Sequence, residues 1–189
     1  MPRIDAGSVP EHRSQVQARI FAAFAELMAE KSYDAITMAQ LAQRAGLGRT
    51  TIYHHFHDKE AVVVAFAGHE TAQYVDHLQE HLDETDDPRA QLRIYVRNHL
   101  DSGEQFHMGL GPQLYGVLPA SSLEEIREHV TEVEQVLARI LRAGQEAGVF
   151  TIEDLDATMR LVHACLSPRH LPPETIEEFV LRAVGAAAE

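Results

Sequence analysis

Several features that mark other classes of protein are scarce or missing in this sequence of 189 residues. Its single cysteine, Cys165, excludes an internal disulfide and a zinc site built from cysteines. No run reaches the about 18 to 20 apolar residues that a membrane-spanning helix needs. The first residues also lack the basic-then-apolar pattern of a signal peptide. We therefore expect a soluble, cytoplasmic protein that has no membrane partner.

Signals for strands, internal repeats and catalysis are missing as well. The sequence contains no phosphate-binding loop, no nucleophile–base motif and no His-Glu-x-x-His zinc motif. We therefore expect no enzyme and no cofactor. Apolar residues, 45% of the chain, recur instead at helical spacing and predict an all-α protein. The expected helices cover residues 13–31, 38–45, 49–56, 58–83, 89–102, 121–147, 154–166 and 173–187, with short helix and loop over 103–119.

Positive charge is also scarce, and its distribution is uneven. The chain has 16 Lys and Arg against 29 Asp and Glu, for a net charge of -13. Residues 1–60 hold seven basic and seven acidic residues, so the acidic excess lies wholly in residues 61–189. The overall charge therefore neither supports nor excludes nucleic-acid binding by the first part of the chain.

The most informative segment, residues 37–59, predicts two short helices joined by a glycine turn. Thr37 and Gln40 have the spacing of a capping box, in which each side chain bonds the other residue's backbone N–H. Gly46 ends the first helix. In the second helix, Ile52 and Phe56 share an apolar face. This arrangement is a helix-turn-helix, whose second helix lies in the major groove of DNA.

The sequence AGLGRTTIYHHF at 45–56, followed by DKEA at 58–61, resembles the signature of the TetR/AcrR family of transcriptional regulators. The motif-level resemblance covers about residues 14–66. It departs from the family pattern at Ser32, where the family usually has a helix-ending Gly. Gly48 and Thr50 stand where the family commonly has Ser and Gly, which affects the expected DNA contacts at these positions.

Residues 1–12 are polar and contain Pro2, Gly7 and Pro10, which predicts a flexible arm. The resemblance implies two further segments: an N-terminal three-helix DNA-binding domain with the helix-turn-helix over 13–60, and a C-terminal helical ligand-binding and dimerisation domain over 61–189. In this interpretation Arg49 reads guanine, and a threonine touches a thymine methyl or a phosphate. The other contacts are to the sugar-phosphate backbone. For each single residue, the alternative is an ordinary solvated helix face. The expected DNA-binding residues are Thr37, Gly48, Arg49, Thr50, Thr51, Tyr53, His54, His55 and Lys59.

The resemblance also implies a partner and an effector. The last two helices, about 154–166 and 173–187, have broad apolar faces that suit a homodimer. The small-molecule effector, of unknown identity, should bind among the middle helices and release a palindromic operator in double-stranded DNA. Most apolar residues there are expected to be plain core. The candidate ligand contacts are Tyr95, His99, Phe106, Met108, Tyr115 and His129.

Two other functions stay open at this point. His77 and His81 are four residues apart on one helix and could chelate a metal, which would make the protein a metal-responsive regulator. The sequence identifies no third ligand, and a solvated helix face is the alternative. A helical enzyme is the second rival. Activation rather than repression is also compatible with the sequence, because the position of the operator is not encoded in it.

Overall fold

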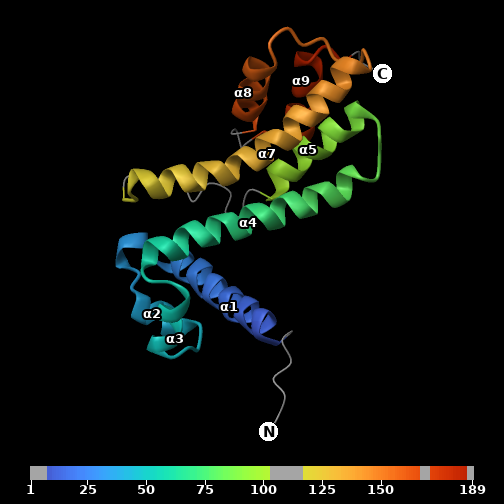
Figure 1. The fold of residues 1–189 in the computed structure, drawn as a ribbon. Coiled ribbons are helices and arrows are strands. Elements are labelled where there is room, and N and C mark those ends of the chain that lie inside the picture. The colour runs from blue at the N-terminus through green and yellow to red at the C-terminus, as the bar shows by residue number, and fades with distance from the viewer. Residues whose placement is uncertain (1–7, 103–116, 167–170, 187–189) are drawn as a thin grey trace. The chain divides into compact units, whose positions relative to one another are not determined.

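The computed structural model describes residues 8–102, 117–166 and 171–186, and every regular element in these ranges is helical (Figure 1). The predicted all-α class is therefore confirmed. Within these ranges, no helix has both the length and the apolar content required to cross a bilayer. The elements are α1 (Ser8–Glu30), the 3-10 turn η1 (Tyr33–Ala35), α2 (Met38–Arg44), α3 (Arg49–His55), α4 (Lys59–Leu82), α5 (Pro88–Ser102), α7 (Ala120–Glu146), α8 (Leu155–Cys165) and α9 (Pro173–Ala183).

The first helix begins earlier than predicted. We expected an arm over residues 1–12, but α1 starts at Ser8. The prolines that suggested an arm include Pro10, which lies in the first turn of the helix. A missing N–H is tolerated there because the first N–H groups of a helix have no intrahelical partner. Glu11, also in this turn, faces the positive end of the helix dipole.

The chain forms two compact units. The first unit contains α1, η1, α2, α3, the start of α4 up to Ala67, and described residues 117–125. The second contains the rest of α4, α5, most of α7, α8 and α9. Two helices, α4 and α7, thus contribute residues to both units.

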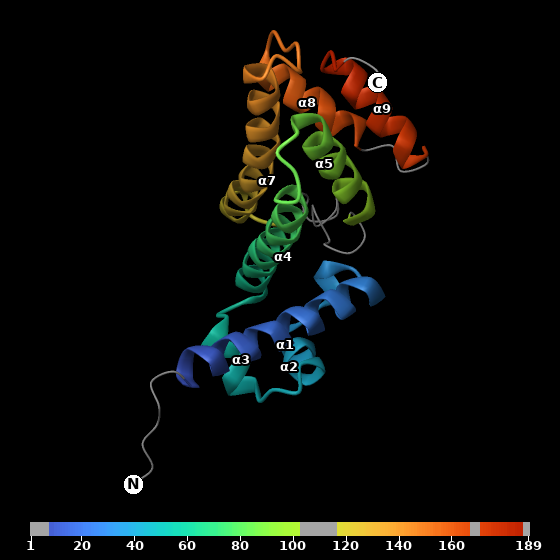
Figure 2. The ribbon, with the colours of Figure 1, turned by 90° about the vertical axis from the view of Figure 1, so that its right-hand side faces the viewer.

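The first unit has an aromatic core. Figure 2 shows α2 and α3 together against α1. The rings of Phe21 and Phe24 on α1 lie 6.0 and 5.1 Å from the ring of Phe66 on α4, measured between centroids. Phe21 also lies 5.9 Å from Phe56, which follows α3. These contacts hold the recognition helix and the start of α4 on the same support.

The second unit is built on α7. Its apolar face packs with residues of α4, α5, α8 and α9 in one core cluster. At its end, Gly144 lets the buried ring of Phe150 lie directly on the helix backbone. On α9, the buried carboxylate of Glu177 joins α5 through Nε of Arg93 at 3.2 Å and Nε of Arg97 at 2.5 Å. One face of α9 is therefore fixed to α5.

Candidate nucleic-acid interface

The predicted capping box at the start of α2 is confirmed. The backbone N–H of Thr37 donates to Oε1 of Gln40 at 3.0 Å, and the N–H of Gln40 donates to the Thr37 hydroxyl at 3.3 Å. The end of α2 is also determined by residues that are close in sequence. Gly46 has a φ of +63°, and the N–H of Leu47 donates to the carbonyl of Ala42 at 2.8 Å. The chain turns sharply here because glycine adopts a positive φ without steric cost.

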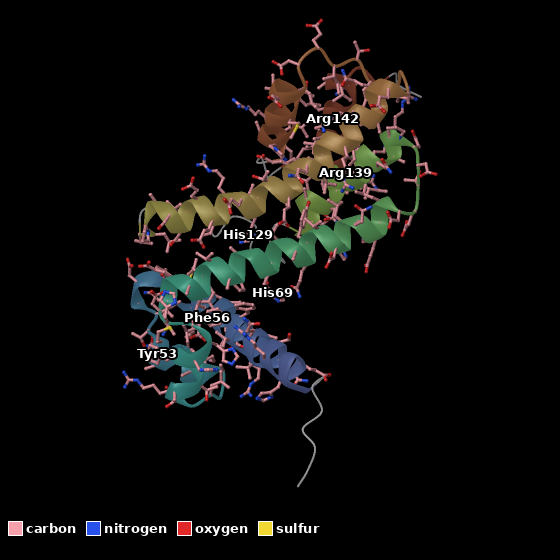
Figure 3. All side chains as sticks on the ribbon, in the orientation of Figure 1. Tyr53, Phe56, His69, His129, Arg139 and Arg142 are labelled. Carbon is pink, nitrogen blue, oxygen red and sulfur yellow. The ribbon has the colours of Figure 1, made fainter. Side chains whose placement is uncertain are left out.

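The recognition helix α3 has the two faces that the sequence predicts. Ile52 is fully buried and Phe56 is nearly so, which holds the helix on the core. Gly48, Arg49 and His54 are exposed, as are their neighbours Thr50, Thr51 and Tyr53, the last with 44% of its surface accessible. Figure 3 labels Tyr53 and Phe56, which mark the outer and inner sides of this motif. An exposed polar helix on a rigid support is what major-groove recognition requires.

Thr37 and Lys59, which were predicted as phosphate contacts, lie at the starts of α2 and α4. Thr37 is exposed, although its hydroxyl already accepts the capping hydrogen bond. The ammonium group of Lys59 donates to the carbonyl of Tyr33 at 2.8 Å and lies 4.0 Å above the centre of the Tyr33 ring. Burial raises the pKa of Tyr33 to about 12, with smaller effects from Glu60, Asp58 and Asp34. Lys59 therefore also fixes η1 against the start of α4.

His55 is half-buried at the end of α3, beside the exposed His54. Burial lowers the pKa of His55, and electrostatic interactions with His54, Arg13 and His12 lower it further. His55 is therefore held in its neutral form at neutral pH, and Arg49 is the residue of α3 that carries a permanent charge.

Two arginines with clear roles in this unit were missed by sequence reasoning. Arg44, at the end of α2, pairs with Glu26 at 3.1 Å and with Glu30 at 2.8 Å on α1. These hydrogen bonds raise the pKa of Arg44, and the bond to Arg44 lowers the pKa of Glu30. Arg19 on α1 donates to the carbonyls of the turn after α2. The apolar pattern of α1 does not indicate that Glu26 and Glu30 pair with Arg44, or that Arg19 contacts the turn after α2.

Two family models identify the class of protein to which this interface belongs. The sequence model of "Bacterial regulatory proteins, tetR family" matches residues 20–66, and that of "Tetracyclin repressor-like, C-terminal domain" matches residues 88–187, more than half of the chain. The chain belongs to the TetR family. The interface is therefore that of a DNA-binding transcriptional regulator, and the predicted resemblance is confirmed.

Three relatives of this TetR-family chain illustrate the likeness. The fatty acid metabolism regulator protein of Bacillus subtilis (strain 168) is 25% identical over 136 residues, which is 69% of this chain and 68% of the relative. The TetR-family regulator PfmR from Thermus thermophilus has a TM-score of 0.68 at 26% identity, with 90% of this chain and 100% of PfmR covered. FadR from Bacillus subtilis, crystallised with stearoyl-CoA, has a TM-score of 0.71 at 19% identity over 88% of each chain. The last similarity is one of fold.

In the second unit of this TetR-family regulator, part of the predicted ligand set comes together. Tyr95, fully buried on α5, shares a 2.9 Å hydrogen bond with Nε2 of His163 on α8. The ring of His99 stacks 6.3 Å from that of Tyr95. Burial raises the pKa of Tyr95 and lowers that of His163, so both groups are held neutral. Sequence reasoning did not select His163, because nothing local links it to Tyr95.

The remaining predicted ligand contact in the described ranges, His129, has a different neighbour. His129 on α7 lies against Gly68 on α4, where an added Cβ would be 2.8 Å from its Nε2 (Figure 3). Phe106, Met108 and Tyr115 lie outside the described residues. The rings of His77 and His81 lie close to each other in an edge-on arrangement, with centroids 4.6 Å apart, and Nδ1 of His81 is 2.8 Å from the His77 carbonyl. Across the described ranges, no group of three or more His, Cys, Asp or Glu is placed to hold a metal.

Two further surfaces of the second unit are relevant to binding. A groove of about 730 Å³ lies along α4, α7 and α8, and Arg139 and Arg142 line it beside Glu132, Glu134 and Asp156. Figure 3 labels both arginines.

The other surface lies on the last two helices, where large apolar side chains face outward. These are Leu161 on α8, 67% exposed, and Phe179 on α9, 54% exposed. Cys165 at the end of α8 is half-buried, and burial raises the pKa of its thiol.

Proposed function

We propose that this TetR-family protein is a homodimeric repressor, and that a small molecule releases it from a palindromic operator. The observation that carries the proposal is the exposed polar face of α3, which is supported by a fully buried Ile52. Such a helix presents side chains to DNA at fixed positions. A two-fold dimer then presents two of them, and a roughly palindromic operator matches that symmetry.

The α3 side chains divide by chemistry into two roles. Arg49 has the planar donor fork that matches O6 and N7 of guanine. Thr50 and Thr51 offer a hydroxyl and a methyl to a phosphate or a thymine. We assign the backbone-positioning contacts to the remaining predicted residues, since hydroxyl, imidazole and amide N–H groups bind phosphate oxygens without reading sequence. These are Gly48, Tyr53, His54 and His55, with Thr37 and Lys59 at the flanking helix starts.

The last two helices are the proposed dimer interface. Leu161 and Phe179 are largely exposed, whereas the opposite side of α9 is occupied by Glu177 and its arginines on α5. Burying a side chain such as Phe179 is worth about 1.5–3 kcal/mol, and a two-fold interface counts every such residue twice. A second copy of this chain fits that surface. Exchanging Leu161 and Phe179 for glutamates should give a monomer, which light scattering detects.

For the effector we propose a long-chain acyl-CoA, and stearoyl-CoA is the first compound to test. The support is a relative: FadR from Bacillus subtilis was crystallised with that molecule. In this chain, the cluster of Tyr95, His99 and His163, in which Tyr95 and His163 are held neutral, offers hydrogen bonds to an uncharged group such as a thioester carbonyl. His129 stays a second candidate contact. Phe106, Met108 and Tyr115 also stay candidates, as predicted from the sequence.

The groove offers Arg139 and Arg142 to phosphate groups. Three carboxylates share that groove, so its charge alone does not select an anion, and the choice of stearoyl-CoA rests on the relative.

The proposed mechanism is a population shift. Ligand releases DNA only if it binds more tightly to a dimer whose two recognition helices no longer match the half-site spacing. By linkage, operator DNA must then weaken ligand binding by the same factor. A regulator that works this way needs no catalytic chemistry, so we also propose that the chain is not an enzyme.

The test begins with selection of bound sequences from a random duplex pool at a stated salt concentration. We expect enrichment of a palindrome, which becomes the probe for ligand titration. Stearoyl-CoA should release this probe, whereas free CoA and stearate should not. Enrichment of no sequence by a folded, dimeric protein would contradict operator reading. Enrichment without release would retain the DNA-binding role and reject this effector.

A further inference from the structure

The turn between α2 and α3 is held from outside by a side chain of α1. Arg19 donates from Nε to the carbonyl of Ala45 at 3.1 Å, and from one terminal nitrogen to the same carbonyl at 2.7 Å. That nitrogen also donates to the carbonyl of Gly46 at 2.9 Å. We propose that Arg19 is a positioning residue for DNA reading: it fixes this turn, and thereby the direction in which the recognition helix leaves it.

The end of α2 has a physical need for such a donor. The last carbonyls of a helix have no intrahelical partner, and they carry the negative end of its dipole. Gly46 and Leu47 return their N–H groups to the carbonyls of Gln43 and Ala42, whereas the carbonyls of Ala45 and Gly46 accept from Arg19. A guanidinium group satisfies both, because its planar donors diverge at fixed angles.

Apart from these hydrogen bonds, the side chains of the turn contribute little to its shape. Two of its four residues, Gly46 and Gly48, have no side chain, and Gly48, the N-cap of α3, provides no side-chain cap. Glycine allows more backbone conformations than any other residue. An error of a few degrees in this turn moves Arg49 and the residues after it relative to the DNA bases. Base contacts are sensitive to such errors because bidentate hydrogen bonds need fixed geometry.

The fit between turn and side chain is close. A Cβ on Gly46 would lie 3.0 Å from the terminal nitrogen of Arg19 that bonds Ala45 and Gly46. Gly46 therefore serves two purposes: it adopts the positive φ, and it leaves room for the guanidinium group.

Arg44 provides a matched control. It also joins α1 to α2 through a guanidinium group, since it pairs with Glu26 and Glu30. Its partners lie on α1, however, and neither is in the turn. A general loss of stability between α1 and α2 should therefore follow from changes at either arginine, whereas misplacement of α3 should follow from changes at Arg19 alone.

The experiment compares Arg19→Lys with Arg44→Lys in the full chain, because both variants keep the positive charge and lose the planar fork. Arg19→Gln is the second Arg19 variant, and all are measured below their melting temperatures. The first readout needs no DNA: hydrogen exchange of the Gly46 and Leu47 amides. We expect exchange to rise about fivefold or more in Arg19→Lys and to stay unchanged in Arg44→Lys. Unchanged exchange in both Arg19 variants would overturn the proposal.

The second readout rests on the operator of the proposed function. We expect Arg19→Lys to bind the selected operator about tenfold more weakly, with random DNA bound as by wild type, so that the ratio of the two affinities falls. Arg44→Lys should keep this ratio. An equal fall of this affinity ratio in both variants would show that Arg19 acts only through stability. If wild type itself prefers no sequence, the proposed function fails, while the exchange result still decides the role of Arg19.

Discussion

Substitution of Gly144 on α7 should destabilise the protein, because the Phe150 ring packs in the space that a side chain at this position would fill. A Cβ added to Gly144 would lie 2.0 Å from Cδ2 of Phe150, 2.3 Å from Cε2 and 2.6 Å from Cγ. Carbon atoms do not approach so closely, so the ring must leave its site. Phe150 is nearly fully buried in the core of the second unit.

Two effects of opposite sign determine how much Gly144→Ala changes the free energy of unfolding. Alanine stabilises a helix interior by about 1 kcal/mol relative to glycine. Forcing a methyl group into a packed core costs about 1–3 kcal/mol, and displacing a buried Phe approaches the 3–5 kcal/mol of its deletion. The unfavourable effect wins, and we expect the free energy of unfolding to fall by about 2 kcal/mol.

Urea unfolding followed by circular dichroism, at one protein concentration, measures this change. Gly68→Ala is the control, because the three atoms nearest to the added methyl belong to the ring of the half-buried His129 side chain, which can rotate away. That variant should be as stable as wild type or gain up to about 1 kcal/mol. Combining Gly144→Ala with Phe150→Leu should recover part of the loss. A Gly144→Ala variant as stable as wild type would refute the packing argument.

Three further predictions concern the DNA interface and the second unit. Arg49→Ala should weaken operator binding by about 1–3 kcal/mol and relax base preference at one position per half-site; an equal loss on random DNA would show that Arg49 touches only phosphate. Glu177→Ala leaves two half-exposed arginines without their buried carboxylate, and should lower stability to urea by about 1–2 kcal/mol, whereas an unchanged midpoint would contradict the role of this pair. The pKa of His163 is lowered on folding, so its neutral form stabilises the protein above the unfolded pKa of about 6.5, and this contribution is lost as the pH falls below that value. The stability difference between wild type and His163→Gln should therefore shrink between pH 7.5 and 5.5, and a constant difference would rule out this linkage.

The features that the sequence predicted well are those set by neighbours along the chain. The capping box joins Thr37 to Gln40, three residues away, and Ile52 and Phe56 face the core one helical turn apart. Both follow from helix geometry alone. A single sequence is sufficient for such patterns.

The features that the sequence did not predict depend on tertiary packing. Arg19 meets Ala45 across 26 residues, Tyr95 meets His163 across 68, and Arg97 meets Glu177 across 80. No periodicity connects such positions, because their proximity depends on how whole helices pack. The early start of α1 has a different cause: the pattern that suggests a loop, proline among polar residues, also suits the first turn of a helix.

The single cysteine gives the proposed mechanism a built-in reporter. Cys165 lies one helical turn after Leu161, so it shares the side of α8 that carries the proposed dimer face. Because every protomer has one thiol, a nitroxide or fluorophore reacts at a single position without prior mutagenesis. Its raised pKa calls for labelling at mildly alkaline pH, where more of the thiol is ionised. Because the thiol lies on the proposed dimer face, its rate of labelling then reports directly whether operator or effector opens that face.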